Sequence, residues 1–293
     1  MDVSARDSGK KLIHRTYLLE HGPSNSIDES MLNFILHHCE LSLELSRLLG
    51  VRFFPGRGLQ GPVGKMLARI ILHHNQGNHE YRDREITKLS LLKDELKQIE
   101  EFDPELLRKF RNQYRRGNRP EYFGTRMEIA AASCFVRKNI SFIKQESPDF
   151  VICRPNGKKV FVECGSTHLS IHKAGNIGYK ISSSIRAKVI LPYFSTATVL
   201  FLDITNVLHN SLISRAYLEQ QAIESVAKQQ MDEKPIGGTC LFFYVMNKES
   251  DSFDLQFIRV DNNTADPELT KFLNELLPVG DQDVSDYDIP SEG

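Results

Sequence analysis

The chain has 293 residues, of which 40% are hydrophobic, so it can form one large or two modest folded domains and is not intrinsically disordered. Its formal net charge of −1 excludes an overall positive charge as the basis of nucleic-acid binding, which would need a local basic patch. The five cysteines are widely spaced and form no CxxC pair, which suits a reducing compartment. No segment approaches the roughly 20 apolar residues of a membrane-spanning helix, and no signal-peptide pattern begins the chain. We therefore expect a soluble, cytoplasmic protein without membrane contact.

The residue pattern of the first 117 residues predicts a lead-in followed by helices. Residues 1–27 are polar and contain glycine, so we expect a flexible lead-in. In residues 28–117 apolar positions recur at helical spacing between breaker residues, which predicts an all-helical region. The helices are predicted at 26–50, ending at Gly50, after Pro62, at 84–102, and from Pro104.

The pattern changes in residues 118–278, where β-like runs alternate with helical ones. This order predicts an α/β fold with helices on a mixed sheet. The remaining residues, 279–293, carry five acids and no base, so we expect a disordered acidic tail. The helices are predicted at 121–138, 176–192, 211–231 and from Pro267, and the strands at 140–144, 148–153, 159–165, 197–204, 239–246 and 253–260.

Two pairs of histidines end apolar helical runs, at 37–38 and 73–74. Neighbouring residues on a helix point about 100° apart, which makes such a pair a poor metal chelate. Polar helix edges are the better interpretation, with a zinc site as the alternative.

Two carboxylates lie in the arms of a predicted β-hairpin. Asn156-Gly157, a dipeptide typical of tight hairpin turns, separates the run containing Asp149 from the run containing Glu163. Strand side chains alternate between two faces, so the register decides whether the two acids share a face. If they do, they repel each other unless a cation lies between them, and Mg²⁺ or Mn²⁺ is the hard cation such oxygen ligands suit.

The helix before the hairpin adds a third acid. Glu128 shares a helix face with small residues, among them Gly124 and Ala131, which predicts a helix packed closely on the sheet with this acid pointing inward. A buried carboxylate without a partner is costly, so Glu128 should have one. A metal site is one candidate.

Together these residues carry a family resemblance. A helix with Glu128, the sequence SPDF with Asp149, a hairpin, and VFVEC with Glu163, within residues 119–205, resemble the restriction-endonuclease-like PD-(D/E)XK nuclease superfamily. The resemblance implies a restriction-endonuclease-like mixed sheet in which Asp149, Glu163 and the main-chain carbonyl of Cys164 hold Mg²⁺ or Mn²⁺, with Glu128 completing the shell. It also implies metal-assisted hydrolysis of phosphodiester bonds.

The chain departs from the family motif at one position. The motif expects a lysine two residues after the second acid, where this sequence has Gly165. The resemblance allows a relocated lysine, and Lys159, Lys180 and Lys188 are candidates. Lys159 lies towards the hairpin turn, whereas Lys180 and Lys188 lie along the helix after the motif. We favour Lys180 as catalytic, because it is nearer the start of that helix, and expect Lys188 to contact nucleic acid.

A basic stretch precedes the predicted catalytic helix. It contains no acids, and Phe110 and Tyr114 lie among its bases. Such a stretch can neutralise phosphates and stack on a base, although a solvated helix face at a domain junction explains it equally well. Its bases are Arg108, Lys109, Arg111, Arg115, Arg116 and Arg119.

The sequence therefore predicts a divalent-metal-dependent endonuclease, with DNA expected rather than RNA as the substrate. The alternative is a catalytically inactive nuclease-fold module that binds nucleic acid or a protein partner. Gly165 favours the module, and the presence of three suitably ordered acids favours the enzyme. A homodimer remains open, because many nucleases of the family act as dimers.

Overall fold

The computed structural model describes residues 29–53, 61–116, 119–167, 177–205, 220, 223–225, 235–247, 252–278 and 287–288. The chain divides into two compact units, the first made of Met1–Lys97 and Leu107–Arg115, the second of Gln98–Leu106 and Arg116–Gly293. The division after Arg115 lies beside the boundary expected at 117/118, and residues 98–106 belong to the second unit. Within the described residues, no helix combines the length and apolarity that crossing a membrane requires.

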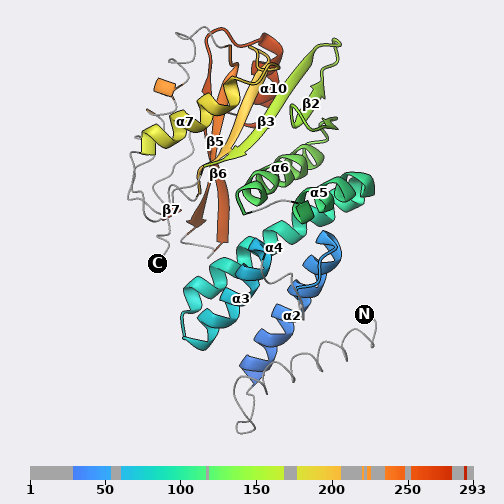
Figure 1. The fold of residues 1–293 in the computed structure, drawn as a ribbon, viewed down its shortest axis with the longest axis vertical. Helices are drawn as coiled ribbons and strands as arrows, with labels where there is room; N and C mark the ends of the chain where they lie inside the picture. The colour runs from blue at the N-terminus through green and yellow to red at the C-terminus, as the bar shows by residue number, and fades with distance from the viewer. Residues whose placement is uncertain are drawn as a thin grey trace. The chain divides into compact units, whose positions relative to one another are not determined.

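Helices make up the described part of the first unit, and two of them continue into the second (Figure 1). Gly50 takes a left-handed conformation with φ of 62° and ends the first helix, as its position in the sequence predicts. The N–H of Val51 donates to the Ser46 carbonyl at 3.1 Å and closes that end. The helices are α2 (Glu29–Leu49), α3 (Pro62–Asn75), α4 (His79–Phe102) and α5 (Pro104–Arg116).

The histidines of this unit contribute to its packing. His38 is buried, and its Nε2 lies 3.0 Å from the Leu67 carbonyl oxygen. The His74 ring stacks on Phe34 with 3.7 Å between the ring centroids, and Arg82 Nη1 lies 3.1 Å from His74 Nδ1. The interpretation as a polar helix edge is therefore wrong for His38, which is buried, whereas its neighbour His37 is exposed.

The second unit is an α/β structure built on a mixed sheet. Its strand order is β1-β2-β3-β4-β5-β6, with β7 paired to β5. The pairs β3–β4 and β4–β5 are parallel and the other pairs are antiparallel. The elements are α6 (Arg119–Arg137), β1 (Ile143–Lys144), β2 (Phe150–Cys153), β3 (Lys159–Ser166), α7 (Ile177–Val189), β4 (Thr198–Asp203), β5 (Gly238–Asn247), β6 (Ser252–Asp261), α10 (Pro267–Leu276) and β7 (Tyr287–Asp288).

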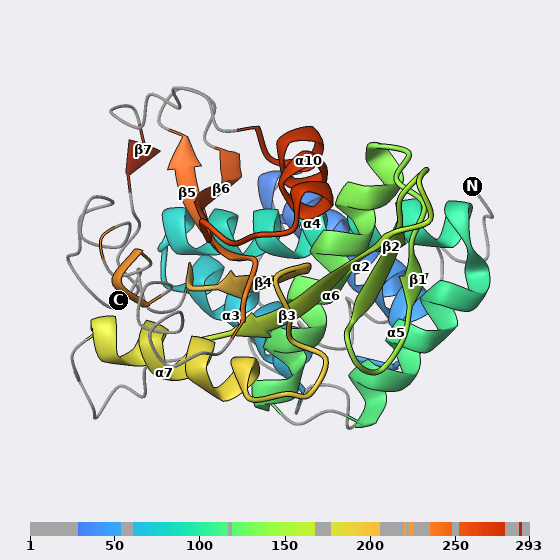
Figure 2. The same cartoon turned by 90° about the horizontal axis from the view of Figure 1, so that it is seen from above.

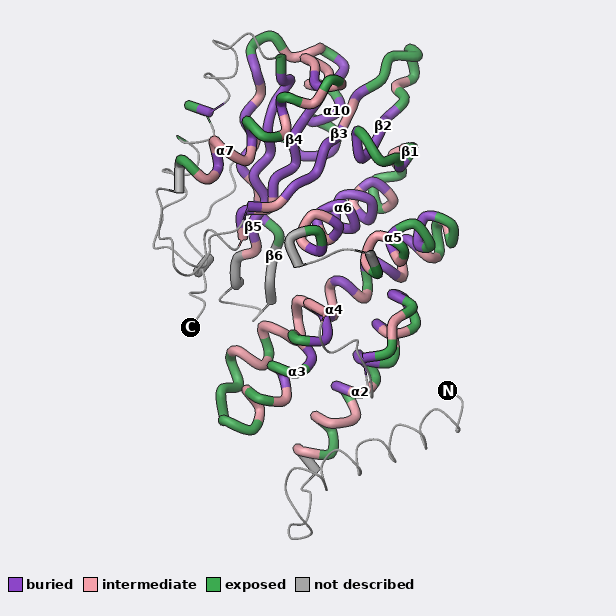
Figure 3. The backbone as a smooth tube through the Cα atoms, in the orientation of Figure 1, coloured by how far each residue is buried: buried purple, intermediate pink, exposed green. Residues whose placement is uncertain are grey.

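Helices cover both faces of this sheet. Phe135 of α6 contacts Phe150 of β2 and Phe272 of α10, so α6 and α10 pack on one face. Ile181 and Ile185 of α7 pack against Leu200, Leu202 and other apolar residues of the central strands. α7 and α10 lie on opposite sides of the sheet (Figure 2), and the central strands between the layers are largely buried (Figure 3).

Two differences from the sequence-based expectation concern the ends of elements. The strand expected at 140–144 is reduced to β1, and Tyr287–Asp288 pairs with β5, so the expectation of a disordered tail is wrong for those two residues. The rest of the tail, the lead-in and most of the helix expected at 211–231 lie outside the described residues.

Candidate active site

The hairpin register places Asp149 opposite Glu163. Val151 pairs with Phe161 and Phe150 with Val162, so one further step brings the two acids side by side. A two-residue turn at Asn156-Gly157 would shift the pairing by one residue and set Asp149 opposite Cys164. The two acids would then lie on opposite faces of the hairpin. The loop takes one extra residue: Gly157 has φ of 80° and donates its N–H to the Arg154 carbonyl at 2.9 Å.

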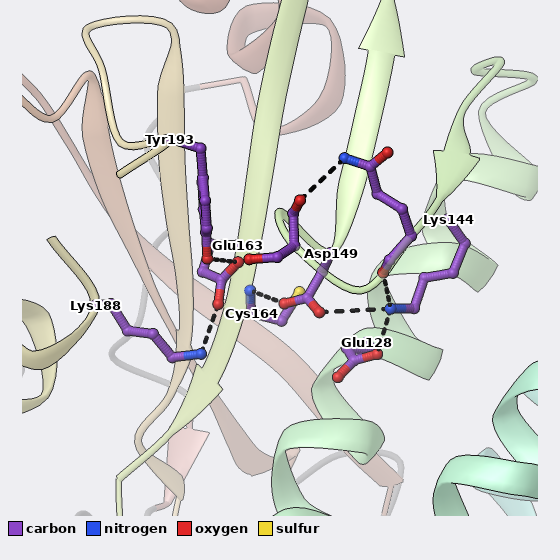
Figure 4. Close-up of polar contacts among 9 residues, drawn as sticks. Glu128, Lys144, Asp149, Glu163, Cys164, Lys188 and Tyr193 are labelled. Atoms are coloured by element: carbon purple, nitrogen blue, oxygen red, sulfur yellow. Dashed lines mark hydrogen bonds and ion pairs between the residues drawn. The ribbon is translucent and has the colours of Figure 1, made fainter. Parts of the chain in front are cut away.

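Asp149 lies at the centre of the site (Figure 4). Its Oδ2 accepts a hydrogen bond from the Cys164 N–H at 2.7 Å, and its Oδ1 lies 3.4 Å from Lys144 Nζ. Burial and the nearby carboxylates of Glu128 and Glu163 raise the pKa of Asp149 to about 7, although Lys144 and the Cys164 N–H oppose that rise. Another cation beside Asp149 would favour its ionised form.

Lys144, which the sequence analysis did not single out, links Asp149 to Glu128. Its Nζ lies 2.9 Å from Glu128 Oε2 and donates to the Gln145 carbonyl at 2.8 Å. Burial would lower the pKa of Lys144, but the two carboxylates outweigh burial and raise it. Glu128 therefore points inward as predicted, and the partner it has in this structure is an ammonium group.

Lys188 and Tyr193 hold the other acid. Lys188 Nζ lies 2.6 Å from Glu163 Oε1, and the Tyr193 hydroxyl donates to Oε2 at 2.8 Å. Glu163 is buried, whereas 34% of the Lys188 side chain is exposed. Burial would lower the pKa of Lys188, but Glu163 outweighs burial and raises it, so the amine stays protonated. Figure 4 shows Lys188 and Tyr193 on one side of β3 and Lys144 and Glu128 on the other.

The side chain of Lys188 passes over Gly165. A Cβ atom added to Gly165 would lie 3.6 Å from Lys188 Cε and 3.4 Å from Leu202 Cδ1. Lys188 thus lies where a lysine side chain at position 165 would begin. Lys180, the favoured candidate, is half-buried about two turns earlier on α7, and Lys159 is exposed beside the hairpin turn. Among the three lysines considered, Lys188 is the one that contacts Glu163.

The backbone adds an oxygen atom to the site. The N–H of Phe161 donates to Ala197 on the β4 side, so the even-numbered residues of β3 direct their N–H and C=O groups towards β2, whose pairing with β3 ends at Phe150 and Val162. The Cys164 N–H donates to the Asp149 side chain instead of to a β2 carbonyl, so the Cys164 carbonyl lies beyond the paired part of the hairpin and on the same side of β3 as Asp149. Burial and the surrounding carboxylates raise the pKa of the Cys164 thiol, which argues against a thiolate ligand.

These donors suit a hard divalent cation. Two carboxylates and a carbonyl are the oxygen ligands that Mg²⁺ and Mn²⁺ prefer. Within the described residues, no three acidic, histidine or cysteine side chains already converge as a metal cage, because Glu128 and Glu163 face lysines. The residues fit one cation held by Asp149, Glu163 and the Cys164 carbonyl, with the carboxylates turning towards it.

The basic stretch on α5, which was predicted to bind nucleic acid, contains two arginines that bind carbonyl groups of the protein itself. Arg111 donates from Nε to the Leu48 carbonyl at 2.7 Å, and Arg115 donates to the Gly50 carbonyl, so both satisfy the end of α2. Phe110 is fully buried, so the expectation that it could stack on a base is wrong. Arg108 and Lys109 are exposed, and the side chains of Arg116 and Arg119 lie outside the described part.

Comparison with protein-family models, with curated proteins and with solved structures gives no match to this chain. The site itself is therefore the basis for a function. Lys144 and Tyr193 were not predicted as site residues from the sequence. Each carries a weak signal: Lys144 interrupts an apolar run just before Asp149, and Tyr193 follows α7 directly.

Proposed function

We propose that this chain is a divalent-metal-dependent endonuclease with a restriction-endonuclease-like domain that hydrolyses phosphodiester bonds, with DNA as the expected substrate. One observation carries the proposal: the register that sets Asp149 beside Glu163, with Lys188 over Gly165. Acids that can hold a cation and a fixed ammonium group then lie at one place. This combination can support phosphodiester hydrolysis.

Asp149, Glu163 and the Cys164 carbonyl would hold the cation. When bound, a divalent cation polarises the scissile phosphate and lowers the pKa of a water molecule. Lys188 is protonated because the Glu163 carboxylate raises its pKa. It therefore acts as a hydrogen-bond donor that orients the attacking water or stabilises negative charge on the phosphate, and not as a base. Tyr193 fixes the orientation of Glu163 through its hydrogen bond to Oε2.

The alternative function is a catalytically inactive module that binds nucleic acid or a protein. The ion pairs of Lys144 with Glu128 and Asp149 favour it, because they neutralise buried acids without a divalent cation. The two functions differ in a simple property. The enzyme binds Mn²⁺ through Asp149 and Glu163 and cleaves DNA, whereas the module does neither.

The test is cleavage of supercoiled plasmid and of single-stranded DNA with Mg²⁺ or Mn²⁺, combined with calorimetric titration of Mn²⁺. We expect Asp149→Ala and Glu163→Ala each to abolish Mn²⁺ binding and to slow cleavage by about 100-fold or more, since such a cation contributes several kcal/mol. Glu146→Ala is the matched control, because Glu146 is exposed and three residues from Asp149. Equal cleavage by the wild type and Asp149→Ala, or unchanged Mn²⁺ affinity in both variants, would overturn the proposal.

A further inference from the structure

We infer that the Lys144 ammonium group permanently fills a second cation position between Glu128 and Asp149, so that the centre takes one divalent cation instead of two. The inference rests on the proposed function and concerns the metal content of that site. Its basis is the set of atoms around Lys144 Nζ: Glu128 Oε2 at 2.9 Å, Asp149 Oδ1 at 3.4 Å and the Gln145 carbonyl oxygen at 2.8 Å.

This environment resembles a cation site in its chemistry. Two carboxylates and one main-chain carbonyl are hard oxygen donors of the kind that coordinate Mg²⁺. An ammonium group has three N–H bonds, and three oxygen atoms are within reach, so its hydrogen-bonding capacity is fully used. Lys188 differs, because the described residues give its ammonium a single carboxylate partner. Lys144 therefore takes the place of a metal cation, while Lys188 can still donate a hydrogen bond to a substrate.

Burial keeps Lys144 in this position. The exposed fraction is 5% for the Lys144 side chain and 11% for Glu128, and Lys144 Nζ lies 5.4 Å from the centroid of the Phe150 ring. Removing one partner from a buried ion pair is strongly destabilising, since it leaves the other charge uncompensated. A divalent cation entering between Glu128 and Asp149 would have to displace a well-satisfied ammonium group.

The charge of the site also favours one cation. Three carboxylates (Glu128, Asp149 and Glu163) and two ammonium groups (Lys144 and Lys188) leave one net negative charge when all are ionised. One divalent cation together with the single negative charge of a phosphodiester makes the buried assembly neutral. A second divalent cation would leave two uncompensated positive charges in a poorly solvated place, which is costly.

The experiment counts bound Mn²⁺ by calorimetry and follows Mn–Mn coupling by electron paramagnetic resonance in four proteins: wild type, Lys144→Met, Glu128→Gln and the double variant. We expect one Mn²⁺ in the wild type and one, bound within about twofold of wild-type affinity, in Glu128→Gln, because Glu128 holds Lys144 and not the metal. Lys144→Met frees Glu128 and Asp149, so it should bind two coupled Mn²⁺ ions. The double variant should return to one.

The possible results separate this inference from the proposed function. If the wild type binds no Mn²⁺, the proposed metal centre fails, and the inference fails with it. If the wild type binds one Mn²⁺ and folded Lys144→Met also binds only one, the inference alone is overturned. Glu128→Gln decides the matter if Lys144→Met does not fold. If Glu128→Gln loses Mn²⁺ affinity by tenfold or more, Glu128 is a metal ligand and the inference is overturned. Unchanged Mn²⁺ affinity in this variant supports the inference.

Discussion

Two regions contain charged residues that the sequence predicts to be functional: the carboxylate site of the second unit and the basic stretch of α5. The charged residues of the two regions make different kinds of contact in the structure. In the site, carboxylates and ammonium groups from separate elements face one another around Asp149. In α5, Arg111 and Arg115 donate to carbonyls at the end of α2, and the ring of Phe110 is buried.

The difference shows which kinds of sequence pattern fix the neighbours of a side chain. A hairpin restricts pairing to a few registers, so the order of Asp149 and Glu163 already limits them to being opposite or adjacent. A basic helical face fixes only the direction in which its side chains point, and not the groups that they contact. The carbonyl groups that end another helix carry partial negative charge and attract arginine much as a phosphate does. Substitutions in the two regions should therefore affect different properties.

The largest expected effect distinguishes Lys188 from Lys180, which lies about two turns earlier on α7. Lys188→Ala removes the ammonium group beside Glu163 and should slow DNA cleavage on the order of 100-fold or more, with Mn²⁺ still bound. Lys180→Ala, on the same helix, should change the rate less than about twofold. Single-turnover plasmid nicking and Mn²⁺ calorimetry measure both properties. If Lys180→Ala carries the loss instead, the assignment of Lys188 is wrong.

A lysine restored at the family position should recover part of that loss. In Lys188→Ala the space beside Gly165 is open, because the nearest remaining atom to an added Cβ is Leu202 Cδ1 at 3.4 Å. Gly165→Lys in this background should therefore raise the cleavage rate about tenfold over Lys188→Ala. Gly165→Met in the same background is the control for bulk without charge. Equal rates for the two double variants would show that position 165 does not give a lysine access to the site.

Particular residues show what could be predicted from sequence and what could not. The hairpin, the inward direction of Glu128 and the mixed sheet follow from local periodicity. The register does not, since the Asn156-Gly157 dipeptide alone favours a two-residue turn, which would offset the two acids by one residue and put them on opposite faces of the hairpin. Lys144 lies in a strand of two residues that exists only through its pairing with β2. The choice between Lys180 and Lys188 depends on where α7 crosses the sheet.

On α5, a substitution should change stability and not DNA binding. Arg111→Ala removes hydrogen bonds to the carbonyls of Leu48 and Arg47 and should lower the free energy of unfolding by about 1–2 kcal/mol. Lys65→Ala, an exposed lysine in the same unit, is the control and should change stability by less than about 0.5 kcal/mol. Urea denaturation gives the stability, and the salt dependence of DNA affinity reports phosphate contacts. A shallower salt dependence at full stability would restore the nucleic-acid interpretation for Arg111.

The smallest effect is a pH dependence centred on His38, another polar residue of the first unit with a structural contact. Burial lowers the pKa of His38 below its ordinary value of 6.5, although the hydrogen bond to Leu67 opposes this. The unfolded chain therefore takes up a proton below about pH 6.5 that the folded chain does not, so stability is complete above that pH and falls as the pH decreases.

His38→Gln keeps a donor for the Leu67 carbonyl but cannot titrate. Comparing it with the wild type therefore isolates the contribution of His38 to the pH dependence of the unfolding free energy. Between pH 7 and pH 5 the wild type should lose up to about 1 kcal/mol more unfolding free energy than the variant, within the limit of roughly 1.4 kcal/mol per pH unit for one proton. Urea denaturation of both proteins at the two pH values measures the difference, in which other titrating groups cancel. Parallel losses would mean that His38 accepts its proton in the folded state, which would make it a solvated histidine and reopen its assignment as a packing residue.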